Sequence, residues 1–377
     1  MIVSNIADLK ALARRRVPRP FFEYVENAAY DGLTKRANRR DLDALRFRQQ
    51  VMRSVAGRSF KVTMLGEQAS MPVGLAPTGL AGGIHVNGEI AGARAAQSFG
   101  VPFCLSTMSI DSIEDVAKAT ERPFWFQLYL MKDRGFTQSL MDRAAAAGCK
   151  VLVLTMDLHV EAQRNRDLKN GFGIPPKLTV GNVASVLTRP RWAFSMLGSK
   201  QFTFGNLKGQ VKGGLGELID WQQSQFDEHF DADSIDWVRA RWAGKMVIKG
   251  VLDPEEARIA AGHGADAVLV SNHGGRQLDG TCSTASILPK VREVLPDGVE
   301  LFVDSGIRSG MDVLKMLALG ARACFIGRAW VYGLGAGGEA GVTKALQLIR
   351  DELDTTMALT GVTDLSKVPP EVLIHND

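Results

Sequence analysis

The 377-residue sequence has no long uninterrupted hydrophobic segment. Near its start, Asp8, Lys10 and the run Arg14–Arg16 separate short apolar pieces, whereas a secretory signal needs a continuous apolar region. No other run reaches the length of a membrane-spanning helix. We therefore expect a cytoplasmic protein that does not cross a membrane.

Cysteine is scarce, and the charges of the two signs nearly balance. The sequence has four cysteines, 45 basic and 41 acidic residues, and a formal net charge of +4 at pH 7. The cysteines, Cys104, Cys149, Cys282 and Cys324, are far apart and have neither metal-ligand nor redox spacing, so we expect reduced thiols and no metal site. The small net charge indicates no particular partner, and nucleic acid is not expected as one.

In other respects the composition is that of an ordinary globular protein. Hydrophobic residues make up 45% of the chain and charged residues 23%, so a chain of this length can bury one large core. Residues 1–70 are polar with helical patterns, a capping Asn5, and Pro20 in the first turn of a second helix. We predict an N-terminal helical segment, 1–70, packed on a larger unit, 71–377.

Eight apolar runs of strand length alternate with amphipathic stretches of helical period. They lie at residues 72–77, 102–106, 123–129, 150–155, 245–249, 267–271, 300–304 and 323–327. Continuous apolar strands are typical of parallel sheets that are buried on both faces. Because a doubly wound sheet usually has fewer strands, the pattern predicts an α/β fold, specifically a (β/α)₈ TIM barrel.

Polar or glycine residues end nearly all of these runs. In a barrel, the carboxyl ends of the strands share one face, where active sites form. The last two runs are followed by Asp304-Ser305-Gly306-Ile307-Arg308 and by Gly327-Arg328. Glycines, backbone N–H groups and arginines at this place in a barrel are typical of phosphate binding, so we expect a phosphorylated cofactor or substrate.

The most informative stretch is 271–280, Ser-Asn-His-Gly-Gly-Arg-Gln-Leu-Asp-Gly, directly after the apolar run 267–270. It brings the imidazole of His273 and the guanidinium of Arg276 to the barrel rim. A neutral histidine can accept a proton near pH 7, and an arginine can bind a carboxylate through two parallel hydrogen bonds. The pair suits an anionic substrate whose hydroxyl group is deprotonated, although a single His-x-x-Arg is more often an ordinary loop.

Two other glycine-rich stretches indicate no cofactor. Gly333–Gly338 has the spacing of a dinucleotide-binding loop, but it follows the last strand instead of opening the first strand–turn–helix unit. Gly209–Gly214 has no strand before it and is interpreted as a loop. Nicotinamide binding is therefore not expected.

With these residues the chain resembles the FMN-dependent 2-hydroxy-acid-oxidising enzymes, a family that includes lactate and mandelate dehydrogenases and glycolate oxidases. The resemblance extends from about Phe21 to Gly361, and segment 271–280 is similar to the family's active-site signature. The catalytic residues that it implies are His273 as the base, Asp157, which stabilises its imidazolium, and Tyr129, near the substrate hydroxyl. The implied substrate-binding residues are Tyr24, Tyr129, Arg164 and Arg276, with the arginines on the carboxylate.

The resemblance also implies an FMN site on the same face. The expected cofactor-binding residues are Ala76, Pro77, Thr78, Gly79, Ser106, Gln127, Thr155, Lys249, Asp304, Gly306, Arg308, Gly327 and Arg328. The backbone of 76–79 would lie against the ring, the next four residues around its polar edge, and the last five on the ribityl chain and phosphate. A cation such as Lys249 beside the ring favours its role as an electron acceptor.

The implied reaction is oxidation of an L-2-hydroxy acid, and L-lactate is the first candidate because the pattern is most similar to bacterial L-lactate dehydrogenases. Within the family, the alternatives are an (S)-mandelate dehydrogenase and a 2-hydroxy-acid oxidase; Met108, where glycolate-type relatives carry an aromatic residue, disfavours glycolate. A non-redox phosphate-binding barrel, such as an aldolase or isomerase, is the alternative from another class. Resemblance alone implies a homotetramer and a quinone or another acceptor in place of oxygen.

A long segment, from about residue 158 to 244, separates the fourth and fifth apolar runs. Most of it is an insertion loop of about 168–244. Between Leu168 and Gly216 it has seven lysines and arginines, interleaved with hydrophobic residues, and neither Asp nor Glu. The pattern predicts docking on an anionic membrane, on the inner face of the cell membrane, where a quinone could accept electrons. The alternative is a lid whose hydrophobic residues pack on the barrel.

Overall fold

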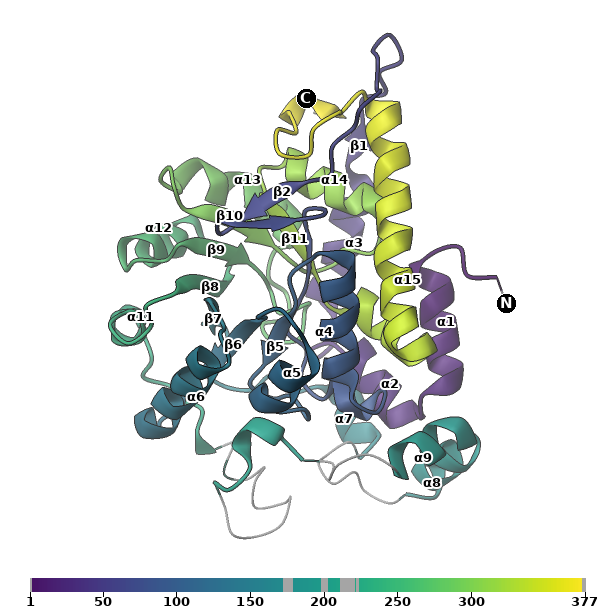
Figure 1. The fold of residues 1–377 in the computed structure, drawn as a ribbon, viewed down its shortest axis with the longest axis vertical. Helices are drawn as coiled ribbons and strands as arrows, with labels where there is room; N and C mark the ends of the chain where they lie inside the picture. Colours follow the sequence, from purple (N-terminus) through teal and green to yellow (C-terminus); the bar gives the residue numbers. More distant parts are fainter. Residues whose placement is uncertain (1, 172–178, 198–202, 211–220, 222–223, 375–377) are drawn as a thin grey trace.

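A computed structural model describes residues 2–171, 179–197, 203–210, 221 and 224–374 (Figure 1). Its centre is a parallel sheet of eight strands in the order β4-β11-β10-β9-β8-β7-β6-β5. The strands are β4 (Val73–Leu75), β5 (Cys104–Ser106), β6 (Trp125–Tyr129), β7 (Val151–Thr155), β8 (Lys245–Val251), β9 (Ala267–Val270), β10 (Glu300–Val303) and β11 (Ala323–Ile326).

The two edges of this sheet meet. A parallel bridge joins Leu75 of β4 to Phe103, next to β5, and the amide of Leu75 donates to the carbonyl of Pro102 at 2.8 Å. Every residue of β7, β9 and β11 is buried, as expected for strands covered on both sides. The predicted (β/α)₈ barrel and its eight strands are confirmed.

One helix lies in the connection after each strand and covers the outside of the barrel (Figure 1). In chain order these helices are α4 (Gly88–Phe99), α5 (Ile113–Ala119), α6 (Arg134–Ala146), α11 (Ala232–Arg239), α12 (Pro254–Gly262), α13 (Thr284–Val294), α14 (Gly310–Ala318) and α15 (Arg328–Thr360). Side-chain caps fix where several of them begin; Ser112 and Asp231, for example, each form a capping box. Gly333–Gly338 lies inside α15, which confirms that it is not a dinucleotide-binding loop.

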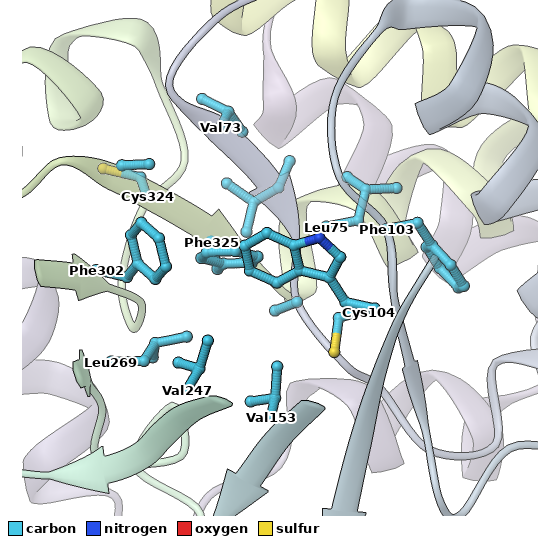
Figure 2. Close-up of a cluster of buried hydrophobic side chains, with 14 of the residues drawn as sticks. Val73, Leu75, Phe103, Cys104, Val153, Val247, Leu269, Phe302, Cys324 and Phe325 are labelled. Atoms are coloured by element: carbon cyan, nitrogen blue, oxygen red, sulfur yellow. The ribbon is translucent and has the colours of Figure 1, made fainter. Parts of the chain in front are cut away.

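The barrel interior is filled by large side chains, among them Phe302 and Phe325 (Figure 2). The ring of Trp125 lies 5.9 Å from that of Phe302 and 5.3 Å from that of Phe325. Gly74 of β4 makes this packing possible, because a Cβ atom there would lie 2.5 Å from the ring of Phe325. The filled interior leaves the site to form at the strand ends and not along the barrel axis.

Three helices precede the barrel: α1 (Ile6–Arg16), α2 (Arg19–Glu26) and α3 (Leu33–Ala44). The side chain of Asn5 accepts a hydrogen bond from the amide of Asp8 at 2.9 Å, and Pro20 lies in the first turn of α2, as predicted. Helix α1 packs along α15, while α2 and α3 lead to the rim of the barrel (Figure 1).

The helical segment ends at Ala44, so the expectation of helix up to residue 70 is wrong for its last third. There, β1 (Arg46–Phe47) pairs with β12 (Leu373–Ile374), next to η3 (Pro370–Val372), and β2 (Val62–Met64) forms a hairpin with β3 (Glu67–Ala69). The amide of Leu65 in the hairpin turn donates to the carboxylate of Glu300 at 3.0 Å. Strands of two or three residues are too short to show a period in the sequence.

The insertion after β7 contains α7 (Asn165–Lys169), α8 (Val180–Leu187), α9 (Pro190–Leu197) and η2 (Gly205–Leu207); η1 (Ala81–Gly83) precedes α4. Helices α8 and α9 form a pair beside α1 and α2 (Figure 1). Trp192 of α9 packs on Phe21, with ring centroids 5.0 Å apart, and Phe204 is buried. Some hydrophobic residues of the insertion therefore pack inward, as the lid alternative expects. Phe202 and residues 211–214 lie outside the described residues.

Four hydrophobic side chains of α8 and α9 are more than 70% exposed. Val180, Leu187, Phe194 and Leu197 are 89%, 74%, 73% and 81% exposed. Within the part of the chain that the structure describes, no helix is long and apolar enough to cross a membrane.

Candidate active site

A cavity of about 640 Å³ opens at the carboxyl ends of the barrel strands. All of the predicted site residues except Asp157 line it: Tyr24, Ala76, Pro77, Thr78, Gly79, Ser106, Gln127, Tyr129, Thr155, Arg164, Lys249, His273, Arg276, Asp304, Gly306, Arg308, Gly327 and Arg328. They come from strand ends, α2 and the insertion, and are brought together because parallel strands end on one face.

The turn after β9 presents the imidazole of His273. His273 has a φ of 55°, which is rare for a residue with a side chain, and the next two glycines also have positive φ values. Gly275 allows the turn to approach α3, because a Cβ there would lie 2.6 Å from the backbone nitrogen of Lys35. This left-handed turn brings His273 to the cavity wall, and unusual backbone of this kind is typical of functional sites.

Asp157 lies behind His273 and outside the cavity lining. Its Oδ1 is 2.9 Å from Nδ1 of His273. A carboxylate at this position favours the tautomer with the proton on Nδ1, so Nε2 keeps its lone pair. His273 is therefore oriented to accept a proton on Nε2.

Burial, more than the neighbouring charges, sets the protonation of this imidazole. Burial lowers the pKa of His273 below its ordinary 6.5, and Asp157 opposes that shift. Burial raises the pKa of Asp157, but His273 and Lys249 together hold it at about 2. The Lys249 ammonium is buried, lies 4.0 Å from Asp157 Oδ2, and donates to Ser271 at 3.1 Å. An ionised Asp157 can stabilise an imidazolium when one forms.

Two guanidinium groups lie at the same end of the cavity. Arg276 donates to the carbonyl of Tyr24 at 2.6 Å, and its Cζ lies 4.7 Å from the centroid of the Tyr24 ring. Arg164 pairs with Glu161 at 3.0 Å, and its buried Nε has no acceptor among the described residues. Burial and the neighbouring Arg164 lower the pKa of Arg276. Two cations this close favour an anion between them, and a carboxylate fits.

Tyr129 lines the cavity between the base and the arginines. Burial, together with the nearby Asp157 carboxylate, raises the pKa of Tyr129 well above its ordinary 10. Its hydroxyl therefore remains protonated at neutral pH, and it can donate a hydrogen bond to an oxygen bound in the cavity.

A row of polar side chains crosses β5, β6 and β7 on the cavity wall. Ser106 donates to Gln127 at 3.1 Å, and Gln127 donates to Thr155 at 3.0 Å. The strand register pairs Ser106 with Gln127 and Thr155 with Lys249, which places the ammonium at the end of the row. A planar ring with several polar edge atoms, such as the flavin of FMN, suits this wall.

Two further arginines, Arg308 and Arg328, line the cavity. Arg328 donates to the carbonyls of Val25 and Gly274, both at 2.8 Å, and so joins α2 to the turn of His273. Arg308 lies 5.8 Å above the ring of Tyr332. Burial and the nearby Arg328 lower the pKa of Lys35 to about 7. Lys35 lies outside the cavity lining and pairs with Glu26 at 3.7 Å. Arg308 and Arg328, together with the backbone of Gly306 and Gly327, fit a phosphate group.

Several lining residues could not be predicted, because they come from the insertion. Leu168, Phe204 and Phe226 line the cavity, as do Glu161 and Asp167. The buried Asn206 fixes this part of the insertion: it donates to Ser109 at 2.9 Å and accepts from the amide of Ile113 at 2.8 Å. No local pattern in the sequence links these residues to the site.

Comparison with known proteins gives one family. A profile of the FMN-dependent dehydrogenase family matches residues 13–375. The chain is 42% identical to an L-lactate dehydrogenase of Ectopseudomonas mendocina (strain ymp) over 99% of both chains, and 43% identical to one of Stenotrophomonas maltophilia (strain R551-3) over 100% of both.

The chain belongs to the FMN-dependent dehydrogenase family. The family resemblance that was inferred from segment 271–280 is confirmed, and so is FMN as the cofactor. The protein is an FMN-dependent oxidoreductase.

Solved structures of the family match the whole fold. The crystal structure of the monotopic membrane protein (S)-mandelate dehydrogenase is 36% identical over 100% of both chains, with a TM-score of 0.96. A soluble mutant of the membrane-associated (S)-mandelate dehydrogenase from Pseudomonas putida is also 36% identical over 100% of both chains, with a TM-score of 0.86. The family is thus shown at the level of both sequence and fold.

Proposed function

We propose that this FMN-dependent dehydrogenase oxidises an L-2-hydroxy acid, and that the acid is L-lactate, which becomes pyruvate. The observation that carries the proposal is that His273, held from behind by Asp157, lines one cavity with Arg164 and Arg276, which places a base beside a carboxylate site. Relatives 42% and 43% identical are named L-lactate dehydrogenases, which supports lactate over other 2-hydroxy acids.

Each residue then has a specific task. FMN, when bound, would accept the α-hydrogen together with the two electrons of its bond to the α-carbon. Arg164 and Arg276 bind the carboxylate and fix the orientation of the α-carbon, which also selects one enantiomer. His273 takes the hydroxyl proton on Nε2, and Asp157 stabilises the imidazolium. Tyr129 donates to the substrate oxygen, and Tyr24 supports the carboxylate through its contact with Arg276.

The residues around FMN divide by chemistry. Ala76, Pro77, Thr78 and Gly79 would lie along the ring, and Ser106, Gln127, Thr155 and Lys249 at its polar edge. Asp304, Gly306, Arg308, Gly327 and Arg328 would hold the ribityl chain and phosphate. In this assignment Arg328 acts mainly through its backbone, because its guanidinium already donates to three carbonyls, those of Val25, Asn27 and Gly274.

The test is steady-state kinetics with an artificial dye as acceptor. The purified protein should be yellow, and kcat/KM should be highest for L-lactate, lower for (S)-mandelate and near zero for D-lactate. A higher kcat/KM for (S)-mandelate would replace lactate with the alternative that the mandelate dehydrogenase structures favour. A colourless protein with no affinity for FMN would contradict the whole assignment. It would favour the alternative of a non-redox barrel, such as an aldolase or isomerase.

We further propose that the enzyme docks on the inner face of the cell membrane and passes electrons to a quinone. The exposed Val180, Leu187, Phe194 and Leu197 on α8 and α9 support this, because surface helices that insert into a membrane carry exposed hydrophobic residues beside basic ones. One solved relative is itself described as a monotopic membrane protein.

Docking is tested by co-sedimentation with anionic vesicles. A variant with V180S, L187S, F194S and L197S should sediment less than the wild type. The matched control is V51S/M52S, since Val51 and Met52 are 68% and 94% exposed in the loop after β1, far from α8 (Figure 1). Equal sedimentation of all three proteins would leave the lid interpretation in place.

The acceptor and the assembly need separate measurements. A quinone analogue or dye should be reduced much faster than oxygen, and peroxide formed at the dye rate would make the enzyme an oxidase. A homotetramer is proposed from family resemblance, and sedimentation equilibrium in detergent measures it directly. Nucleic acid is not a proposed partner.

A further inference from the structure

A second depression, of about 680 Å³, lies between α1 and the chain that follows α8. One face of α1 contributes Lys10, Arg14 and Arg15, and the other wall is Thr188 and Arg189. We call it the α1–α8 groove. It is separate from the active-site cavity, and no acidic side chain is among its lining residues.

The cations of the groove are not neutralised within it. Lys10 is paired with Glu26 at 2.6 Å, but Arg14 and Arg15 are exposed and form no ion pair with any described residue. Arg189 donates through Nη1 to the carbonyl and hydroxyl of Ser185, at 2.8 and 3.0 Å, and to the hydroxyl of Thr188 at 3.0 Å. Its Nη2 donates across the groove to the carbonyl of Arg14 at 3.4 Å. Its Nε is buried and has no acceptor in the described part of the chain. Unpaired guanidinium groups and a buried free N–H point to an anion with several oxygen atoms.

The position of the groove identifies the source of that anion. Leu187, 74% exposed, immediately precedes Thr188 and Arg189, and the exposed face of α8 continues through Val180. At a membrane surface, the lipid phosphates lie above the acyl chains. Arginines can contact the phosphates while the hydrophobic residues beside them contact the acyl chains. A free phosphate ion would need no hydrophobic residues next to it.

We propose that the α1–α8 groove binds the phosphate of an anionic phospholipid headgroup, through Arg14, Arg15 and Arg189. The proposal rests on the membrane docking proposed above and adds a defined headgroup site on the N-terminal helix. Arginine suits this task because its planar fork binds two phosphate oxygens at once, which a lysine ammonium cannot do.

The experiment measures partitioning of the full-length, FMN-loaded protein onto vesicles of phosphatidylcholine mixed with phosphatidylglycerol. R14A/R15A should bind about thirty-fold more weakly than the wild type, because each basic residue at an anionic surface contributes about 1 kcal/mol. Both side chains are exposed at the end of α1, so folding is not at risk; dye-linked activity should be unchanged.

Two controls separate the groove from general charge. K290A/K367A removes the same charge from exposed lysines near α13 and the C-terminal end, on the side of the molecule opposite α8 and α9, and should bind like the wild type (Figure 1). R14K/R15K keeps the charge but loses the two-oxygen contact, and it should bind more weakly than the wild type.

The outcomes are distinguishable. If R14A/R15A and K290A/K367A bind equally well, the groove is not a headgroup site, while docking through α8 and α9 stands. If R14K/R15K binds like the wild type, diffuse charge attraction replaces the phosphate site. If the wild-type protein does not bind anionic vesicles at all, both the docking and the groove are overturned.

Discussion

Nδ1 of His273 lies 2.9 Å from Oδ1 of Asp157. Of these two residues, His273 lines the cavity and Asp157 does not. The two nitrogens of the ring therefore have different tasks. Nδ1 fixes the tautomer and the orientation, and in the proposed mechanism Nε2 takes the proton of the substrate. Asp157 acts through His273, and this difference separates the effects expected when each residue is replaced.

Replacing the base should stop the chemistry and leave the cofactor bound. We expect His273→Gln to slow reduction of the bound flavin by L-lactate about 10²- to 10⁴-fold, the usual contribution of a general base. The rate is measured anaerobically by stopped-flow absorbance, and FMN content by the spectrum of the purified variant. A single-turnover rate near that of the wild type would show that another group takes the proton.

The dependence of kcat/KM on pH tests how Asp157 acts on His273. The base works when deprotonated, so kcat/KM should be full above the pKa of His273, which burial places below 6.5, and should be lost as pH falls through it. Asp157 raises that pKa, so in Asp157→Asn the acid limb should move to lower pH while the plateau falls, because the imidazolium is no longer stabilised. An acid limb that moved to higher pH would contradict this role.

Much of this site could be predicted because the fold makes it regular. Strands such as β7 and β9 are buried on both faces, so each is a continuous apolar run in the sequence, and the polar residue after each run is a rim residue. Thus Thr155 and His273 can be placed on the rim from the sequence pattern. The chemistry of His273 beside Arg276 predicts a proton acceptor, and the family resemblance supplied the role of Thr155.

The remainder depends on packing that no local pattern records. Trp192 and Leu187 belong to the same basic and hydrophobic stretch, but Trp192 packs on Phe21 while Leu187 faces solvent. Phe204 reaches the cavity only because Asn206 hydrogen-bonds to the loop after β5. The short hairpin of β2 and β3 was missed because three residues cannot show a strand period.

The carboxylate site should be sensitive to the shape of the cation as well as to its charge. In Arg276→Lys, the ammonium cannot make two parallel hydrogen bonds or keep the contact with Tyr24. We expect KM for L-lactate to rise and kcat to fall together, because a carboxylate that is less well held lets the α-carbon move away from the flavin. Unchanged kcat and KM would exclude a two-oxygen contact with Arg276.

The last prediction concerns a buried carboxyl pair beneath the rim. Glu89 of α4 and Asp111 are both buried, and Glu89 accepts from the amide of Ile110 at 3.1 Å. Burial, with repulsion from Asp111, raises the pKa of Glu89 from 4.5 to about 8. The folded protein thus retains a proton that the unfolded chain releases above about pH 4.5. This contribution to stability is full below that pH and is lost as pH rises toward 8.

Glu89→Gln should remove this pH dependence, because an uncharged amide costs nothing to keep buried as pH rises. We expect the thermal midpoint of the FMN-loaded wild type to fall between pH 5.5 and pH 8.5, and that of the variant to fall less. The matched control is Glu293→Gln, an exposed glutamate on α13, whose midpoint should follow the wild type at both pH values. A parallel fall in all three proteins would mean that Glu89 is ionised in the folded state over this range, with its carboxylate held by the amides around it.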